Sequence, residues 1–390
     1  VSTNGGTTYS NELLIQGNTN AKWSFVSGTG IVNQNYDGDG ISNNFNPGGG
    51  GSLTSTGYSS ITLGKLPKSA TLKIKITVNS NMNEIWAIDN IFLYGRREVA
   101  TTWSGTAWSN GAPASNTKAI FNGNYTSAIN GDVSACKCQV NAGKTVVVSP
   151  NTTFSIESDV DNKGIFQVDN SGVLIQKNDF AINTGAAKIK RFSTPMRRYD
   201  FTYWSSPVAG QSLFSFSPLT LSDKYFQFDP IIGNWVNVPN STTMSIGKGY
   251  IIRAPQTFDI VTPTIFDTGE FNGVPNNGFI QTPIALGASN LNLIGNPYPS
   301  ALSANAFLSF PENASVVEGT IYLWTHNTAL ANNVYSSNDY AVYNYSGTVG
   351  TSASTSSGLN TQIPTGKIAS GQSFFIKGLA KDRKSTRLNS

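Results

Sequence analysis

The sequence predicts an all-β protein of several domains, and three observations lead to this prediction. The chain has 390 residues, enough for two or three domains. Short runs rich in Val, Ile, Phe, Tyr and Trp alternate with turns that use 38 Gly and 17 Pro, a pattern typical of strands and hairpins. No long stretch places apolar residues at the i, i+3, i+4, i+7 spacing of an amphipathic helix. We therefore expect almost no helix.

The first predicted domain covers residues 1–97. Residues 72–78 alternate apolar side chains with Lys and Thr, so we expect a strand with one buried face and one solvated face. The run EIWAIDNIFLYG at residues 84–95 is predicted to be the closing strand. These strands resemble the last two-thirds of a jelly-roll β-sandwich of the type attached to secreted bacterial proteins. The resemblance implies a jelly-roll-like sandwich whose first strands lie before Val1.

Residues 98–187 are predicted to form a short β-solenoid or a ladder of hairpins. Gly143, Gly164 and Gly172 each precede a short apolar strand, and such repeated steps from glycine to strand suggest stacked rungs. The aromatic start of this segment, TTWSGTAW, is expected to cap its first rung. A solenoid buries its core only by stacking, so the segment should rest on a neighbouring element.

One set of strands occurs twice within residues 188–381. The first copy reads YWSSPVAG, KYFQFDP and GKGYIIRA, and the second reads LIGNPYPS, TIYLWTHN and GQSFFIKG. A repeat of this size indicates that one β-unit was copied and packed against itself, because neither copy can bury its apolar face alone. We predict a β-sandwich built from the two copies. Pro207 should align with Pro297, and Gly247 with Gly371.

The last nine residues, DRKSTRLNS at 382–390, differ in style from the rest of the chain. They read as the in-frame translation of a sequencing-library adapter, so we expect an extended tail with few contacts. Without this tail the net charge would fall by 2 from its value of +4, and the chain would be nearly neutral.

Composition argues against two classes of partner. Charged residues make up only 12% of the chain, against roughly a quarter in ordinary globular proteins, so Asn, Ser, Thr and Gly must cover the surface, as is common in extracellular β proteins. No cluster of Lys and Arg forms the stripe that nucleic-acid binding requires. No apolar run approaches the roughly 20 residues of a membrane-spanning helix. We expect neither a nucleic-acid partner nor a transmembrane segment.

Several motifs follow one another between residues 101 and 381 in a recognisable order. They are TTWSGTAWSNGAP, RRYDFTYWSSPVAGQSL, KYFQFDPIIGNW, GKGYIIRAPQ, LNLIGNPYPSA and LWTHNT. Together they resemble large surface proteins of gliding and soil Bacteroidetes that the type IX secretion system exports. The resemblance implies an extracellular or outer-surface location. It also implies a C-terminal sorting domain, beyond this sequence, that engages the secretion machinery. It assigns no active site.

Cys136 and Cys138 are the only cysteines. On a strand, two residues two apart lie on one face, and a disulfide between them would close a ring too tight for ordinary geometry. A metal site would need further Cys or His ligands nearby, and the sequence has none. We expect two buried thiols.

The catalytic candidates are few. His326 is the only histidine, so any Ser-His-Asp or Cys-His centre would have to use it. We expect it to be a polar residue at a strand end that forms a local hydrogen bond. Glycoside hydrolysis needs two carboxylates flanking one bond, but most of the 22 acidic residues lie in turns, among them Asp161, Asp169 and Asp223. The sequence therefore predicts that this chain is not an enzyme.

A structural calcium ion is the one cofactor for which the sequence offers candidate ligands. Asp37 and Asp39 lie in NYDGDGISN, which places side-chain oxygens at alternate positions but has Asn46 where a calcium loop has its bidentate Glu. A plain Asp-Gly turn is the favoured interpretation there. Asp89, in the predicted closing strand, is the second candidate, because carbohydrate-binding jelly rolls often use an aspartate at that place.

Two hypotheses of function remain. The first is a non-catalytic, surface-displayed or secreted structural or adhesive protein. The alternative is the accessory region of a secreted polysaccharide-degrading enzyme, whose jelly roll binds an extracellular glycan. A concave sheet with two or more exposed aromatic side chains would favour the alternative. Flat faces covered by Thr and Asn would favour the first. Trp103 and Trp108 lie in a polar segment, where we expect them to cap an edge.

Overall fold

The computed structural model describes residues 1–9, 14–17, 23–27, 31–32, 63–64, 72–77, 99–326, 328, 339–345, 349–351, 362–379 and 385–388. The chain divides into two compact parts, Val1–Gly95 and Arg96–Ser390. Strands dominate the described residues, and helix is limited there to four segments of four to six residues. They are α1 (Ser127–Asn130), α2 (Leu213–Phe216), α3 (Ala304–Ser309) and α4 (Pro311–Ala314). The predicted all-β class with a β-solenoid is confirmed.

The described residues of the N-terminal part contain two strand pairs. β1 (Leu14–Gly17) pairs antiparallel with β2 (Trp23–Ser27), and β3 (Ile31–Val32) pairs antiparallel with β4 (Leu63–Gly64). The predicted closing strand at residues 84–95 lies outside the described residues. The jelly-roll architecture of this part therefore stays a prediction.

The strand expected over residues 72–78 differs from the structure where it is described. Within 72–77 only Lys73 forms a ladder contact, an isolated bridge to Ser2. Ile74 and Ile76 are 41% and 50% exposed, so this apolar face is not buried. Alternation predicts which residues share a face, but burial also needs a second layer, and nothing in the local pattern supplies one.

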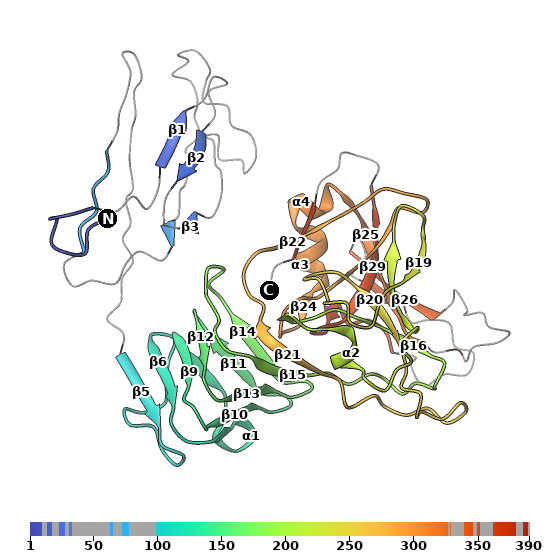
Figure 1. Ribbon diagram of the computed structural model, residues 1–390, viewed down its shortest axis with the longest axis horizontal. Coiled ribbons are helices and arrows are strands. Elements are labelled where there is room, and N and C mark those ends of the chain that lie inside the picture. The colour runs from blue at the N-terminus through green and yellow to red at the C-terminus, as the bar shows by residue number, and fades with distance from the viewer. Residues whose placement is uncertain are drawn as a thin grey trace. The chain divides into compact units, whose positions relative to one another are not determined.

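A parallel β-solenoid begins the main part of the chain (Figure 1). Its strands are β5 (Val99–Trp103), β6 (Thr117–Phe121), β7 (Tyr125–Thr126), β8 (Val133–Ala135), β9 (Lys137–Val140), β10 (Thr145–Val148), β11 (Thr153–Ile156), β12 (Val160–Asn162), β13 (Ile165–Val168), β14 (Val173–Gln176) and β15 (Ala187–Lys190). They form three parallel sheets, ordered β5-β6-β9-β12, β7-β10-β13-β15 and β8-β11-β14. Three successive strands make one rung, and each rung stacks on the one before it.

Regular spacing lets the rungs share one core. Tyr125, Val146, Phe166 and Ala187 occupy the same place in successive rungs, at intervals of 21, 20 and 21 residues. All four are buried, while their strand neighbours are mostly half-buried or exposed. This period-two alternation explains why short apolar runs here become strands of a solenoid, since each strand needs to bury only its inward-facing residues.

The first rung is closed by the two tryptophans of its polar start. Residues 104–111 fold back over β5, where Trp103 and Trp108 form a bridge and their rings lie 5.5 Å apart. The indole N–H of Trp103 donates to the carbonyl oxygen of Asn124 at 2.9 Å, and Trp108 packs against the solenoid core. The side chains therefore cover the open end of the stack, and the backbone of 104–111 protects its edge strand.

Two antiparallel strands extend one solenoid sheet. β21 (Glu270–Pro275) pairs with β15 on one side and with β17 (Val208–Ala209) on the other. The resulting six-stranded sheet has the order β17-β21-β15-β13-β10-β7. A single hydrophobic cluster accordingly runs from Trp103 in the first rung to Phe271 in β21. The solenoid thus rests on the element that follows it.

Most of the remaining strands form two antiparallel sheets. The first sheet contains β16 (Phe201–Trp204), β18 (Tyr225–Asp229), β19 (Asn234–Asn237) and β20 (Tyr250–Arg253), in the order β16-β20-β18-β19. The second contains β23 (Leu291–Gly295), β25 (Val317–Trp324), β26 (Tyr340–Asn344), β27 (Val349–Thr351) and β29 (Ser373–Gly378), in the order β23-β29-β25-β26-β27. Both sheets therefore place the first strand beside the last long strand, and β27 is an extra edge strand.

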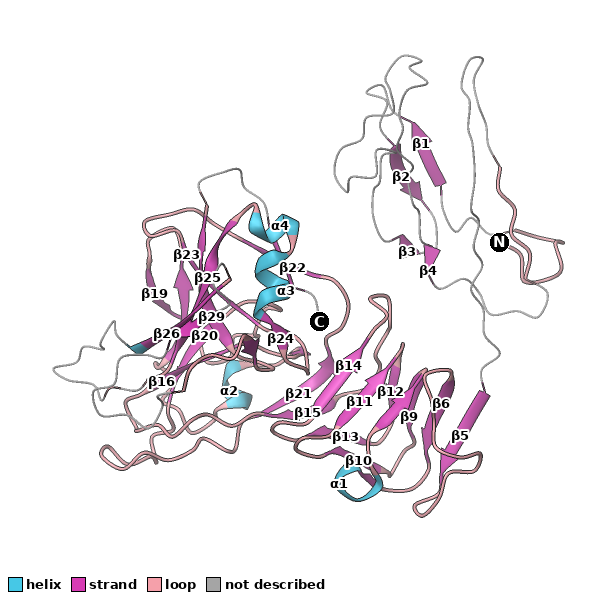
Figure 2. Cartoon of the chain, turned by 180° about the vertical axis from the view of Figure 1, so that it is seen from behind, coloured by secondary structure: helices cyan, strands magenta, loops and turns pink. Residues whose placement is uncertain are grey.

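Each antiparallel sheet buries both of its faces. In the first sheet, Trp204 and Ile252 point into the cluster that continues from the solenoid. In the second, residues such as Phe374 pack with α3 and α4, which lie beside it (Figure 2). The opposite faces contribute to a third cluster, which we call the inter-sheet cluster. Its residues are Phe201, Tyr203, Phe226, Phe228, Trp235, Ile251, Leu291, Leu293, Tyr322, Trp324, Tyr340 and Phe375.

The C-terminal tail differs from its prediction. Ser385–Leu388 forms β30 and pairs antiparallel with β22 (Ile280–Pro283). A shorter pair, β24 (Leu302–Ser303) with β28 (Lys367–Ile368), completes the described strands. The expectation of few tail contacts is therefore wrong for 385–388, because β22 offers these residues an edge to pair with. The adapter origin of 382–390 stays a prediction.

Stacking also predicts where the solenoid tolerates no side chain. A Cβ at Gly164 would lie 2.3 Å from the backbone oxygen of Lys144 and 2.6 Å from that of Asn141, in the rung below. We expect Gly164→Ala to lower the free energy of unfolding by about 1–3 kcal/mol, because a rung must move. Gly319→Ala in β25 is the control, since its Cβ would meet no atom nearer than 3.8 Å. Urea denaturation measures both, and equal effects would contradict close stacking.

Candidate functional site

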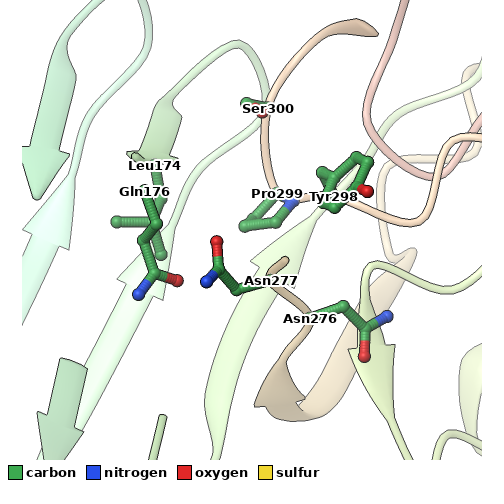
Figure 3. Close-up of a pocket in the computed structure, with 7 residues that line it drawn as sticks. All are labelled: Leu174, Gln176, Asn276, Asn277, Tyr298, Pro299 and Ser300. Atoms are coloured by element: carbon green, nitrogen blue, oxygen red, sulfur yellow. The ribbon is translucent and has the colours of Figure 1, made fainter. Parts of the chain in front are cut away.

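One small pocket lies where the solenoid meets the second sheet (Figure 3). It encloses about 170 Å³, including open solvent at its mouth. Leu174 and Gln176 come from β14, and the rest of the lining comes from the loops before β22 and after β23. The lining residues are Leu174, Gln176, Asn276, Asn277, Tyr298, Pro299 and Ser300. Pockets for small ligands usually measure roughly 300–1,000 Å³, so this one is too small for that role.

The polar groups of this pocket are already engaged in holding the chain together. The amide N–H₂ of Gln176 donates to the carbonyl oxygen of Ser158 at 2.7 Å and to the side chain of Asn183 at 2.8 Å. The hydroxyl of Tyr298 donates to the carbonyl oxygen of Gly278 at 2.7 Å, and burial raises the pKa of that phenol. None of these groups is poised for acid–base chemistry.

Asn276 joins the two sheets at this place. Its buried amide donates to the carbonyl oxygens of Ser206 at 3.1 Å and Pro297 at 3.0 Å, which belong to the turns after β16 and β23. We expect Asn276→Ala to cost about 1–3 kcal/mol of unfolding free energy, since two buried carbonyls lose their donor. Asn277→Ala is the matched control, because its amide bonds in an exposed position to Asn178. Thermal denaturation of both variants tests this, and a larger loss for Asn277→Ala would contradict it.

His326 lies in a buried position just after β25. It is 4% exposed, its φ is +39°, and its Nε2 lies 2.9 Å from Oγ1 of Thr194 in a hydrogen bond. The predicted local hydrogen bond is therefore wrong, because the partner lies 132 residues away. Burial, with a smaller contribution from the charge of Arg197, lowers the pKa of this imidazole to about 4. The ring is neutral near pH 7.

Two buried carboxyl groups belong to the same region. Oδ1 of Asp339 accepts hydrogen bonds from the N–H of Thr328 at 3.0 Å and from its hydroxyl at 2.6 Å. Oδ2 of Asp200 accepts from the N–H of Arg197 at 2.6 Å. Burial raises the pKa of both carboxyls, and the charge of Asp339 adds to the effect on Asp200. The Asp200 bond closes the turn at residues 197–200, just before β16, and the Asp339 bonds lie just before β26.

The arrangement lacks the parts of a nucleophilic centre. In a catalytic triad, a carboxylate orients the second ring nitrogen of the histidine. Nδ1 of His326 has no hydrogen-bond partner among the described residues, and its buried ring is closed to a substrate. Cys138 offers no nucleophile either, because burial raises the pKa of its thiol to about 12.

Cys138 is buried as predicted, but Cys136 is only half-buried, because it lies at the corner before β9.

The predicted calcium ligands Asp37, Asp39 and Asp89 lie outside the described residues. In the part of the chain that the structure describes, no three His, Cys, Asp or Glu residues gather in a way that could hold a metal ion. Asp161 lies in strand β12, not in the turn that the sequence suggested, and is 3.2 Å from Lys163. Asp169 lies in the turn after β13, 3.8 Å from Lys190. Calcium binding through the three predicted aspartates stays a prediction.

The fold defines a class: an all-β protein in which antiparallel sheets continue a parallel β-solenoid. Residues 96–389 match the family model described as a domain of unknown function, DUF8693. The chain belongs to this family. No curated protein matches the chain, and no solved structure does. No helix in the described residues is long and apolar enough to span a membrane.

Sequence reasoning did not single out Thr194, Asp339, Asp200, Gln176 or Asn276. Each is a lone polar residue whose partner lies in a distant segment, and neither periodicity nor motif marks such a residue. The only sequence feature that could have indicated these buried contacts was a polar residue at the end of an otherwise apolar strand. The same feature is expected at turns exposed to solvent, so it does not distinguish the two.

Proposed function

We propose that this chain is a non-catalytic structural or adhesive protein, secreted or displayed at the outer cell surface. The observation that carries the proposal is the continuous core. One hydrophobic cluster and one six-stranded sheet run from the capped solenoid into the antiparallel region. A body with a shared core behaves as one stiff unit, which suits a scaffold that holds its ends at a fixed separation.

The outer faces of the solenoid support the same proposal. Lysine–carboxylate pairs connect neighbouring strands, two between rungs and one between β15 and β21, and each contributes less than about 1 kcal/mol at a surface. The pairs are Lys137–Asp159 at 2.9 Å, Lys177–Glu157 at 2.7 Å and Lys188–Glu270 at 3.1 Å. Such polar faces of balanced charge suit a surface that is displayed in water.

Export by the type IX secretion system is part of the proposal. It rests on the ordered motifs between residues 101 and 381 and on the low content of charged residues. In proteins of this kind a C-terminal sorting domain would be the partner of the secretion machinery.

Duplication of one sandwich unit is the proposed origin of the two antiparallel sheets. The strand orders of the two sheets agree. In the first sheet Ile251 pairs with Tyr203 and Phe226, and in the second sheet Phe375 pairs in the same way with Leu293 and Tyr322. The twelve residues of the inter-sheet cluster then form six matched pairs. The pairs are Phe201 and Leu291, Tyr203 and Leu293, Phe226 and Tyr322, Phe228 and Trp324, Trp235 and Tyr340, and Ile251 and Phe375. When the two sheets are aligned by these registers, Pro207 matches Pro297 and Gly247 matches Gly371.

The alternative function, an accessory glycan-binding region of a polysaccharide-degrading enzyme, gains no support in the described residues. The aromatic side chains with large exposure there lie in loops, turns or a short helix, outside the strands. They are Tyr9, Phe192, Tyr199, Phe214, Phe279 and Tyr345. A stacking platform for sugars would need such rings side by side on one sheet face.

Purified chain coated on beads tests the adhesive role directly. Coated beads should be retained on polysaccharide-coated or bare surfaces several-fold more than uncoated beads, while the chain should release no reducing sugar from soluble polysaccharides. Beads coated with heat-unfolded chain are the control, because adhesion by a folded surface should be lost with the fold. Sugar release, or equal retention of folded and unfolded coatings, would overturn the proposal. Antibody labelling of intact cells tests the location.

A further inference from the structure

The two antiparallel sheets exchange the same backbone contacts in both directions. The N–H of Ser205 donates to the carbonyl oxygen of Gly371 at 2.8 Å, and the N–H of Gly295 donates to that of Gly247 at 3.0 Å. Ser205 and Gly295 are matched positions in the strand registers, and so are Gly247 and Gly371. Such reciprocal contacts indicate a two-fold axis that relates the two sheets. Under a two-fold axis, if residue i of the first sheet contacts residue j of the second, then the counterpart of j in the first sheet contacts the counterpart of i in the second.

Two isolated bridges repeat the relation. Trp204 pairs with Gln372, and Ile294 pairs with Lys248, again from one sheet to the other. Trp204 matches Ile294, and Lys248 matches Gln372. The turns that carry these contacts share the left-handed conformation, with φ of +74° at Gly247 and +65° at Gly371.

The axis itself passes between small residues. A Cβ at Gly295 would lie 2.2 Å from the Cβ of Ser205, its own matched residue. A Cβ at Gly249 would lie 3.0 Å from the Cβ of Ser373, its matched residue in turn. A residue touches its own counterpart only where a two-fold axis runs between them. At the pair of Ser205 and Gly295 one member therefore has to be glycine, whereas at Gly249 the side chain of Leu293 lies nearer than the matched Ser373.

We propose that the inter-sheet cluster is a self-complementary docking surface whose partner is a second copy of the same unit, and that two chains pair through it by exchanging their second sheets. The proposal rests on the duplication argued above and goes beyond the adhesive role. The twelve residues form six matched pairs, so each sheet presents an apolar face that is buried against the face of the other sheet. The same face of a second chain can bury it in the same way.

The connection between the sheets permits the exchange. β21 belongs to the six-stranded sheet of the solenoid, and the next strand, β22, pairs with β30. The chain therefore passes from the first half of the duplicated region to the second at residues 276–279. Within this crossing Gly278 has a φ of +83° and Phe279 is exposed. An exchanged pair keeps every contact of the cluster. The change of course in the hinge has to preserve or replace the hydrogen bonds of Asn276 and Gly278, and these few bonds are the local cost of a dimer formed by exchange.

Two single variants separate pairing within a chain from pairing between chains. Gly295→Ser places two serines on the axis, and we expect its urea midpoint to fall by about 1 M because the two Cβ atoms collide. Ser205→Gly leaves two glycines there and should fold. The double variant Ser205→Gly with Gly295→Ser reverses the native pair, so a two-fold axis predicts that it regains most of the lost midpoint. Oγ of Ser373, which also approaches residue 295, has no hydrogen-bond partner and can rotate away.

The decisive experiment mixes the two single variants. Differently tagged Gly295→Ser and Ser205→Gly chains, unfolded and refolded together at high concentration, should form a heterodimer, because exchange gives one native and one reversed pair. Size-exclusion chromatography with light scattering and pull-down through one tag measure it. Failure of the double variant to recover would overturn the two-fold axis, and recovery without a heterodimer would overturn exchange. Bead retention is a separate readout, so failure of the adhesive role is distinguishable.

Discussion

Replacing Phe154 by alanine should lower the free energy of unfolding by about 3–5 kcal/mol, the largest single effect that we expect in this chain. Phe154 is fully buried in β11, at the centre of the solenoid core. Its ring lies 5.8 Å from that of Phe166 and 5.9 Å from those of Phe121 and Tyr125. Removing it opens a cavity that the rungs above and below cannot fill, because their backbones are fixed by the parallel ladders. Urea denaturation followed by tryptophan fluorescence measures the loss.

Ile129→Ala is the control for this variant. Ile129 belongs to the same solenoid, in α1, but is 83% exposed, so its truncation should change stability by less than about 0.5 kcal/mol. The continuous core adds a second expectation for Phe154→Ala. Trp103 at the cap and Trp204 in the first sheet belong to one cluster, so fluorescence and circular dichroism should report one shared transition. Separate transitions would mean that the solenoid unfolds independently of the sheets.

The sequence was most informative where its repeats were regular. The steps from glycine to strand predicted the solenoid because each rung is a local unit of fixed length, and Trp103 and Trp108 are found at its capped end as expected. Matched turns led to the proposal that two segments arose from one duplicated unit. Local patterns are sufficient for such features, because the same short-range sterics act in every repeat.

The failures concern contacts between segments that are distant in the chain. Ile74 and Ile76 alternate like strand residues, yet they are exposed, since alternation does not specify a second layer. Ser385–Leu388 pairs with β22 although its composition suggested a loose tail, because an available edge can order a polar segment through backbone hydrogen bonds alone. The bond between His326 and Thr194 could not be read from either neighbourhood.

The same reasoning limits what could be predicted about a site. The sequence offered one histidine, two cysteines and scattered carboxylates as candidates, and their chemistry depends on burial that spacing does not reveal. Burial raises the pKa of Cys138 and lowers that of His326, so both groups are neutral near pH 7. Their neutral, enclosed state supports a structural role for each.

His326 should make the protein lose stability as the pH falls from about 6.5 to about 4. The imidazole has a pKa of about 4 in the folded chain and an ordinary value of 6.5 when unfolded, so the unfolded chain binds the proton first as the pH drops. Stability is therefore complete above pH 6.5, declines through this window and levels off below it. The total is about 3 kcal/mol, from 1.36 kcal/mol per pKa unit.

Other groups titrate nearby, so the histidine contribution has to be isolated. The raised pKa values of Asp200 and Asp339 act in the opposite direction, because these folded carboxyls bind protons before the unfolded ones do. His326→Gln removes only the titration, since glutamine can still bond to Thr194. The difference in unfolding free energy between native chain and variant should shrink by about 3 kcal/mol between pH 7 and pH 4. Urea titrations at four pH values measure it, and a constant difference would show that the ring is not held neutral by burial.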